Sequence, residues 1–401
     1  MTEWNRASPE LTLDARFHEA PHDTFAELRA EGGLHRFLAG GRQQSWLVVN
    51  YDDIRRLLRD HRLSKDPETL IAANRRQLGI GDDPEAQASE QVMRTFGEHL
   101  RGLLRTELGT THATSLEGSA RRHAERFLDR FAAGDDDDLL RGFALPYASA
   151  MCCELLGIAE DRQDEVAGHV RDMVLGGSRA ANRALIGVLA DTIVRLRSAP
   201  GADLLSALLA RAREDSRLSD TTLLHSGLIL ITLAVETTFS FITTSVHTLL
   251  RHPESLAAIR RDPSLLDGAV EELLRYNGPH NISAVRATTA PVRVADTEIP
   301  EGKLVSFALT SGNRDPRQFT DPDRFDPTRD ASAHLAFGHG KYRCLGAGLA
   351  RLESKIAIGT LLRRYPQLRI GCRPEELDWA QNPYLHSLRR LPVKLGARAS
   401  D

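Results

Sequence analysis

The residue best placed to do chemistry is a cysteine inside a glycine-rich segment that runs from Phe337 to Arg351. Gly338, Gly340 and Gly346 surround Cys344, and they allow a backbone loop to turn sharply and lie against a flat object. An apolar-periodic helix is expected to begin just after the cysteine. Because the first N–H groups of a helix stabilise a thiolate over a thiol, the spacing favours an anionic sulfur ligand.

A thiolate held in a glycine-rich loop is the ligand that an oxygen-activating haem needs, because it pushes electron density onto the iron. The competing interpretation is a buried, unreactive side chain, which is the commonest role of a single cysteine. The frame F-G-x-G…C-x-G-x-x-L-A-R around Cys344 argues against that interpretation. The remaining cysteines, Cys152, Cys153 and Cys372, form no CxxC pair. The sequence therefore predicts neither a disulfide framework nor a zinc site, and favours a reducing, cytoplasmic setting.

With this frame, the chain resembles a bacterial cytochrome P450 over essentially its whole length. The resemblance implies a mostly α-helical fold with a small β-sheet portion, a haem b cofactor, and Cys344 as the proximal ligand of the iron. It also implies that Phe337, Gly338 and Gly346 lie against the haem. An enzyme of this family takes two electrons from a ferredoxin or flavodoxin with its reductase, activates dioxygen and oxidises a small-molecule substrate.

A charged pair precedes the cysteine loop by about seventy residues, as in this family. Glu272 and Arg275 are spaced i, i+3, so they share one face of a helix and can form a charge-assisted pair. Alone, the spacing predicts no more than a solvated ion pair. The resemblance implies that Arg324 joins the two in a structural triad behind the haem.

An acid followed by a hydroxyl lies in the middle of an apolar helix, at Glu236 and Thr237. Burying such a pair is costly without a purpose. The resemblance implies that the two residues deliver protons to the dioxygen, with Thr237 nearest to it. The alternative is that the Thr237 hydroxyl bonds back to the backbone of its own helix.

The chain departs from the family pattern at two kinds of position. Leu233 and Ala234 stand where the family has a small residue and then glycine, so both are expected at the haem and Leu233 should crowd the space above it. Leu103 and Tyr342 stand where the family has donors to the haem propionates. Two of the usual propionate donors are therefore missing.

The donors that remain are assigned by resemblance. His99 lies in the segment EHLR, which is similar to the helix whose histidine bonds a propionate, and Arg286 stands at another donor position. The Tyr342 hydroxyl is a further candidate. Weaker candidates are Lys341, Arg343 and Arg105. The first two of these could equally lie on the proximal surface and attract an acidic electron carrier.

The substrate pocket is expected between the 64–92 loop and three short stretches of chain. Its residues combine an apolar lining with a few hydroxyl and amide groups. Such a lining suits a medium-sized, partly polar, aromatic natural product better than a plain hydrocarbon. The positions are Leu230, Leu233, Ala234, Ile282, Ser283, Ala284, Val285, Tyr384 and Leu385.

Hydroxylation in the tailoring of a secondary metabolite is the activity that the family implies by default. Given Leu233, the alternative is oxidative C–C or C–N coupling, or ring closure, without oxygen insertion. Its substrate would be a tryptophan- or tyrosine-derived metabolite, for example a cyclodipeptide. Two functions of other classes remain open: a haem-binding sensor or carrier without turnover, and a helical interaction protein without a cofactor.

The rest of the chain must hold these residues in place. It has 401 residues, of which 41% are hydrophobic and 27% charged, and a net charge of −3. This composition provides a large core and does not indicate a nucleic-acid binder. Because no Pro/Ser/Gly-rich linker interrupts the chain, one domain over residues 1–401 is expected. The polar N-terminus and a longest apolar run of only Gly227 to Ala234 predict no membrane span.

Helical periodicity fills residues 91–275 and 344–365, and the pattern from Asp14 to Leu34 predicts a first helix that is ended by Gly32-Gly33. A strand from Gln44 to Val49 and the segments after residue 280 supply the β portion. Residues 64–92 are predicted to be a mobile loop with fragments of helix. The acidic run from Asp135 to Asp138 predicts a solvated turn.

Overall fold

Helices dominate the computed structural model of the protein, which describes residues 15–39, 43–78, 97–108 and 115–399, together with residues 11, 13, 87, 90 and 94. The first half contains α1 (Ala15–Glu19), α2 (Pro21–Glu31), α3 (Tyr51–Leu57), α4 (Pro67–Leu78), α6 (Glu98–Glu107), α8 (Glu117–Ala133), η1 (Leu140–Ala144), α9 (Leu145–Leu156), η2 (Glu160–Arg162), α10 (Gln163–Val174) and α11 (Arg179–Ser198). The second half contains α12 (Leu204–Ala212), α13 (Asp220–Arg251), α14 (Pro253–Arg261), η3 (Pro263–Leu265), α15 (Leu266–Asn277), α16 (Leu309–Asn313), η4 (Gly340–Tyr342), α17 (Ala347–Arg364) and η5 (Pro374–Glu376). The mostly helical fold class predicted from the sequence is confirmed.

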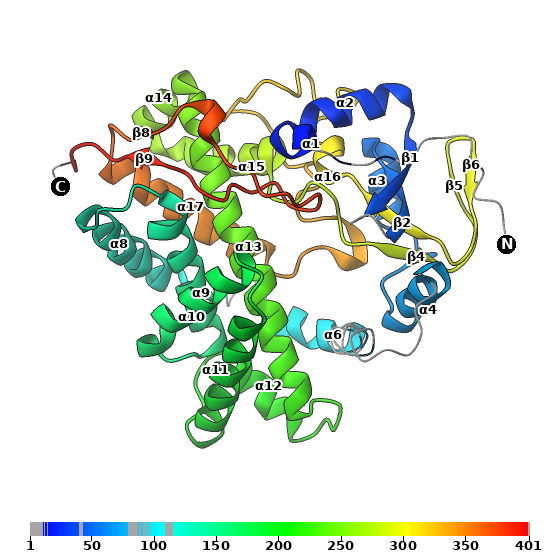
Figure 1. Cartoon of the computed structure of the whole chain (residues 1–401), viewed down its shortest axis with the longest axis horizontal. Coiled ribbons are helices and arrows are strands. Elements are labelled where there is room, and N and C mark those ends of the chain that lie inside the picture. The colour runs from blue at the N-terminus through cyan, green and yellow to red at the C-terminus, as the bar shows by residue number, and fades with distance from the viewer. Residues whose placement is uncertain are drawn as a thin grey trace.

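Helix α13 crosses the molecule and is the axis around which the other helices pack (Figure 1). It contacts α9, α11, α15 and α17, and the largest buried apolar cluster runs along these helices and α8. By length and composition alone α13 could cross a membrane, but 56% of its apolar window is buried inside the protein. Its packing identifies it as the core helix.

Most of the β portion lies to one side of the helices, whereas β8 and β9 lie on the opposite side, beside α14 and α17 (Figure 1). Its strands are β1 (Leu34–Ala39), β2 (Gln43–Val48), β3 (Leu63–Ser64), β4 (Arg286–Thr288), β5 (Val292–Val294), β6 (Thr297–Ile299), β7 (Leu304–Phe307), β8 (Arg369–Ile370) and β9 (Val393–Lys394). Five of them form a sheet in the order β1-β2-β7-β4-β3, in which only β2 and β7 pair in parallel. Because Ser64 pairs with Ala287, the backbone after β3 is brought next to Arg286, at the start of β4.

The predicted first helix is divided in two. It is interrupted at Ala20, before Pro21, whereas its expected end at Gly32-Gly33 is confirmed, because α2 ends at Glu31 and β1 begins at Leu34. Proline lacks the N–H that would continue the α1 ladder. The 64–92 segment was expected to contain fragments of helix, and α4 is one of them. Asp66 caps its start by accepting the N–H and hydroxyl of Thr69. Most of residues 79–96 lie outside the described part of the chain.

Asp138, the last residue of the predicted solvated turn, is buried instead. One carboxylate oxygen accepts the backbone N–H groups of Leu140 and Leu391, which joins the start of η1 to the C-terminal segment. Charge alone favours solvent for such a residue, but two buried N–H groups need an acceptor.

Candidate functional site

The cysteine loop approaches α3 and turns back on itself before α17 begins. Gly338 and Gly340 have φ angles of +68° and +73°, which disfavour residues with a side chain. A Cβ at Gly340 would come within 2.8 Å of the Leu58 carbonyl oxygen, so the approach also requires glycine. The backbone N–H of Cys344 donates to the Phe337 carbonyl at 2.9 Å and closes the loop.

The Cys344 side chain is exposed to solvent, yet enough protein surrounds it that burial raises the pKa of its thiol. The N–H of Gly346 and the guanidinium groups of Arg101 and Arg343 oppose this rise without cancelling it. The thiolate stabilisation expected from the sequence is therefore present but insufficient alone, and a bound cation would have to supply the remainder.

Three buried or half-buried cations gather around the ring of Tyr342, two residues before the cysteine. The Lys65 ammonium lies 5.7 Å from the ring centroid, and the guanidinium carbons of Arg101 and Arg286 lie at 5.7 and 5.0 Å. Burial lowers the pKa of Lys65 to about 8 and that of Arg286 to about 10. Among the described residues, no carboxylate forms an ion pair with any of the three.

The arrangement fits the haem that the resemblance implies. Nε of Arg286 and Nε of Arg101 are buried and have no hydrogen-bond partner among the described atoms. The Nη atoms of both arginines donate to backbone carbonyl groups, Arg286 to that of Leu58 and Arg101 to that of Arg343. The unpaired charges and the two free Nε groups fit a ligand that carries carboxylates. An exposed sulfur beside them provides the metal ligand. Haem has both two propionates and an iron.

The predicted propionate donors are distributed unequally. Arg286 is buried in the cluster, and the Tyr342 hydroxyl accepts the backbone N–H of Lys65 at 3.3 Å. Arg105, Lys341 and Arg343 are exposed. His99 belongs to α6, but its side chain lies outside the described part of the structure. Two cluster members, Lys65 and Arg101, were not identified as donors from the sequence.

The predicted distal residues lie on one stretch of α13 that remains helical throughout. Leu233 is 51% exposed although its neighbours Ile231 and Val235 are buried, so its side chain projects into open space. Ala234 is half-buried on the same stretch. A large apolar side chain exposed on the core helix is unusual and marks a ligand-facing surface.

The side chains of Glu236 and Thr237 differ in their hydrogen bonding. Burial raises the pKa of Glu236, and no hydrogen bond or ion pair to its carboxyl is found within the described residues. The Thr237 hydroxyl donates to the carbonyl of Leu233 at 2.7 Å and lies 3.4 Å from that of Ala234. The structure thus shows the back-bonded state considered as the alternative, in which the lone pairs of the hydroxyl remain able to accept a hydrogen bond.

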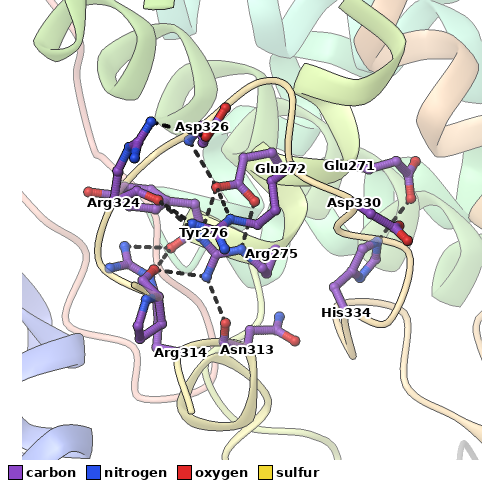
Figure 2. A network of polar contacts seen from close by, with 12 residues as sticks. Glu271, Glu272, Arg275, Tyr276, Asn313, Arg314, Arg324, Asp326, Asp330 and His334 are labelled. Atoms are coloured by element: carbon purple, nitrogen blue, oxygen red, sulfur yellow. Dashed lines mark hydrogen bonds and ion pairs between the residues drawn. The ribbon is translucent and has the colours of Figure 1, made fainter. Parts of the chain in front are cut away.

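The buried triad contains a different arginine from the one predicted. Arg275 donates two hydrogen bonds to Glu272, at 2.6 and 2.8 Å, and a third to the Asn313 carbonyl, as Figure 2 shows. The third charge is Arg329, whose Nε lies 3.2 Å from Glu272. Arg324 contributes only its carbonyl oxygen, while its side chain points to solvent beside Asp326. The assignment of Arg324 is therefore corrected to Arg329.

A second ionic network, not expected from the sequence, connects α15 to the cysteine loop. Glu271 accepts hydrogen bonds from Arg351 and from His334, whose position Figure 2 shows. Although burial alone would raise it, these bonds bring the pKa of Glu271 down to about 2. The Arg351 guanidinium also covers the ring of Phe337, with 4.5 Å to the centroid. The network thus holds both ends of the cysteine loop.

The predicted substrate positions divide into pocket candidates and core. Ile282 is fully buried in an apolar cluster with Ala308, so its assignment to the pocket is wrong. Leu385 is also buried, and its backbone pairs with His280. The positions that keep some exposure are Leu230, Leu233, Ala234, Ser283, Ala284, Val285 and Tyr384.

A fully enclosed acid on α17 leads to a prediction of pH-dependent stability. Burial raises the pKa of Glu353 to about 8, and the hydrogen bond from Thr238, at 3.4 Å, offsets this only in part. The folded chain holds a proton here that the unfolded chain releases above its ordinary pKa, so stability falls as the pH rises from 5 to 8. Glu353→Gln should therefore raise the free energy of unfolding by about 2 kcal/mol at pH 8 and by little at pH 5, and its urea midpoint should rise accordingly.

Urea unfolding at the two pH values measures this difference. Glu298→Gln, in which an exposed carboxyl on β6 is neutralised, serves as the control and should change little at either pH. A gain by Glu353→Gln of equal size at pH 5 and pH 8 would show that titration of Glu353 is not its cause.

Comparisons with known proteins find relatives over almost the whole chain. Residues 191–370 match the family model described as cytochrome P450. The chain is 37% identical to cytochrome P450 monooxygenase PikC of Streptomyces venezuelae, over 97% of this chain and 95% of that protein. It is 34% identical to 6-deoxyerythronolide B hydroxylase of Saccharopolyspora erythraea, over 96% and 98% of the two chains. The solved structure of CxnD, a cytochrome P450 enzyme for C–S bond formation in chuangxinmycin biosynthesis, superposes with a TM-score of 0.81 at 29% identity and covers 98% of this chain and 100% of that one.

Proposed function

The chain belongs to the bacterial cytochrome P450 family of haem-dependent monooxygenases, and we propose that it hydroxylates a medium-sized, partly polar natural product with an aromatic ring. Relatives that tailor secondary metabolites support the general reaction. The observation that supports the substrate is Leu233, whose exposed side chain narrows the ligand-facing side of α13. A flat ring needs less height above such a side chain than a puckered macrolactone does.

The bound haem supplies the activation of dioxygen, with Cys344 as its thiolate ligand. The protein contributes a proton source and a relay on the distal side. Glu236 holds a proton because burial raises the pKa of its carboxyl. The Thr237 hydroxyl donates its hydrogen to the Leu233 carbonyl. Its oxygen is therefore free to accept a hydrogen bond from a group in the pocket and to orient that group.

The electrons come from an acidic ferredoxin or flavodoxin that docks over the cysteine loop in the cytoplasm. A hollow of about 400 Å³ lies there, lined by Arg55, His339 and Arg343 among others. Burial and the charges of Arg55, Arg59 and Arg343 lower the pKa of His339, which shows how closely these cations gather. In the described part of the chain, none of the three arginines forms an ion pair. A positive surface beside the ligand cysteine favours a negatively charged electron carrier.

A second candidate function is oxidative coupling, in which two substrate positions join and no oxygen is inserted. Leu233 favours it, because a bulky side chain restricts the space in which an oxygen atom is transferred to carbon. CxnD, which resembles this chain in structure, is described as forming a C–S bond. The candidate substrate is a tryptophan- or tyrosine-derived metabolite such as a cyclodipeptide.

One experiment separates the two functions. The haem-loaded enzyme is supplied with a ferredoxin, its reductase and NADPH under isotopically labelled dioxygen. The substrates are aromatic cyclodipeptides and, in parallel, a macrolactone. Mass spectrometry of the product should show one labelled oxygen atom for hydroxylation and none for coupling. The proposal predicts labelled product from the aromatic set, and Leu233→Gly should extend turnover to the macrolactone.

An unlabelled product that has lost two hydrogens, or that joins two substrate units, would show that the reaction is coupling and not hydroxylation. Turnover of the macrolactone alone would contradict the proposal of an aromatic substrate. NADPH consumption without any product from a broad panel of natural products would support a haem protein without substrate turnover.

A further inference from the structure

We propose that Lys65 binds a haem propionate in place of the two usual donors that this chain lacks, and that the ring of Tyr342 positions it beside Arg286 and Arg101. Lys65 is a residue to which neither the family pattern nor a motif assigns this role. The assignment rests on haem binding, which the family establishes. Leu103 and Tyr342 occupy the positions from which the two donors are missing.

The charges around Tyr342 indicate a missing anion. Lys65 is enclosed by protein, and burial together with the charges of Arg286 and Arg101 lowers the pKa of its ammonium. The one anionic group that acts in the opposite direction is the sulfur of Cys344. Repulsion between cations in a poorly solvated place is unfavourable, and a bound anion relieves it. A haem propionate bound by Lys65 would supply that anion.

Tyr342 explains how three cations can share one site. A histidine or arginine at this position would bring a fourth charge into the cluster. The phenol ring is neutral, and its face attracts the Lys65, Arg101 and Arg286 groups that surround it. The hydroxyl fixes the backbone of the lysine directly, because it accepts the Lys65 N–H. The tyrosine is therefore a positioning residue, and the lysine the donor.

The location of Lys65 connects the haem to the substrate side of the molecule. The next residue, Asp66, caps helix α4 through Thr69. Helix α4 begins the 64–92 segment from which the pocket was expected. A bond between the propionate and Lys65 would hold the start of this helix in place, so that haem binding orders the entrance of the pocket.

The test compares Lys65→Gln, Lys65→Arg and Lys341→Gln as haem-loaded proteins. Lys341 is the matched control, because its ammonium lies 5.5 Å from the same ring but its side chain is exposed. Haem transfer to apomyoglobin should be about tenfold faster for Lys65→Gln, unchanged for Lys341→Gln, and close to wild type for Lys65→Arg. The reduction potential of Lys65→Gln should become more negative, because a positive charge near the reduced haem is lost. The propionate bending band in the resonance Raman spectrum should shift in the same variant.

The proposal is overturned if Lys65→Gln matches Lys341→Gln in haem loss, potential and Raman spectrum. It is also overturned if Lys65→Gln impairs only the binding of carboxylate-bearing compounds, which would assign the lysine to the substrate. If Lys65→Gln does not accumulate, Lys65→Arg decides the question, because a propionate bound by a guanidinium must change the Raman band. The reduced carbon monoxide spectrum of each variant reports thiolate ligation separately, so failure here leaves the proposed function untouched.

Discussion

Replacing Cys344 with serine should abolish the absorption band at about 450 nm that the reduced carbon monoxide complex of a haem-thiolate protein shows. Product formation should fall by at least about a thousandfold, because the alcohol of serine is a far weaker anionic donor than a thiol. The loop that holds Cys344 would be preserved, since the bond from its N–H to Phe337 belongs to the backbone. The protein should therefore still bind haem and fold.

Cys372→Ser is the control for this variant. Cys372 is partly exposed and lies between β8 and the η5 turn, so its loss should leave both the band and turnover unchanged. Absorption spectra and product yield are measured on equal amounts of haem-loaded protein. Persistence of the band in Cys344→Ser would assign the iron ligand elsewhere and remove the basis of the proposed mechanism.

The parts of the site that the sequence predicted correctly are those whose geometry is local. The Cys344 loop is determined by glycines within seven residues of the sulfur, and their φ angles follow from the residue type. Glu272 and Arg275 face each other because one helical turn separates them. Such relations can be inferred from spacing, because helix geometry converts sequence distance into position.

The parts that were missed depend on contacts between distant segments. Lys65 meets Arg286 and Tyr342 only because β3 pairs with β4 and the cysteine loop folds onto the end of the sheet. A lysine in a polar segment is expected to be exposed to solvent, and the neighbouring sequence gives no sign of the contrary. Ile282 shows the converse, because an apolar residue predicts burial equally well in a core or in a pocket. Strand β1 was not predicted, because its pairing with β2, rather than its own sequence, determines it.

The choice between Arg324 and Arg329 is a case in which an irregular segment decides which side chain turns inward. The two arginines are five positions apart in a stretch without helix or strand, so no periodicity distinguishes them. The N–H of Asp326 donates to Glu272 and pins the chain there. After this point the direction of the backbone brings Arg329, rather than Arg324, back to the glutamate.

Arg329→Ala should destabilise the protein by about 2–4 kcal/mol, whereas Arg324→Ala should change its stability by less than about 0.5 kcal/mol. The Arg329 side chain is 15% exposed and its removal leaves Glu272, which is fully buried, with one cation fewer. It also donates to the carbonyl groups of Thr320 and Asp321, which would lose their partner. The Arg324 side chain is 70% exposed, and its one ion pair is with Asp326 at 3.3 Å.

Urea unfolding of the two haem-loaded variants, followed by circular dichroism and by the carbon monoxide spectrum, measures the difference. Arg329→Lys keeps the charge but loses the planar fork that reaches a carboxylate and two carbonyl groups together, so it should recover only part of the loss. Equal destabilisation by Arg324→Ala would restore the predicted triad. If neither variant is destabilised, the buried Arg275–Glu272 pair is sufficient to stabilise this region by itself. Its two parallel hydrogen bonds would then satisfy both side chains without a third charge.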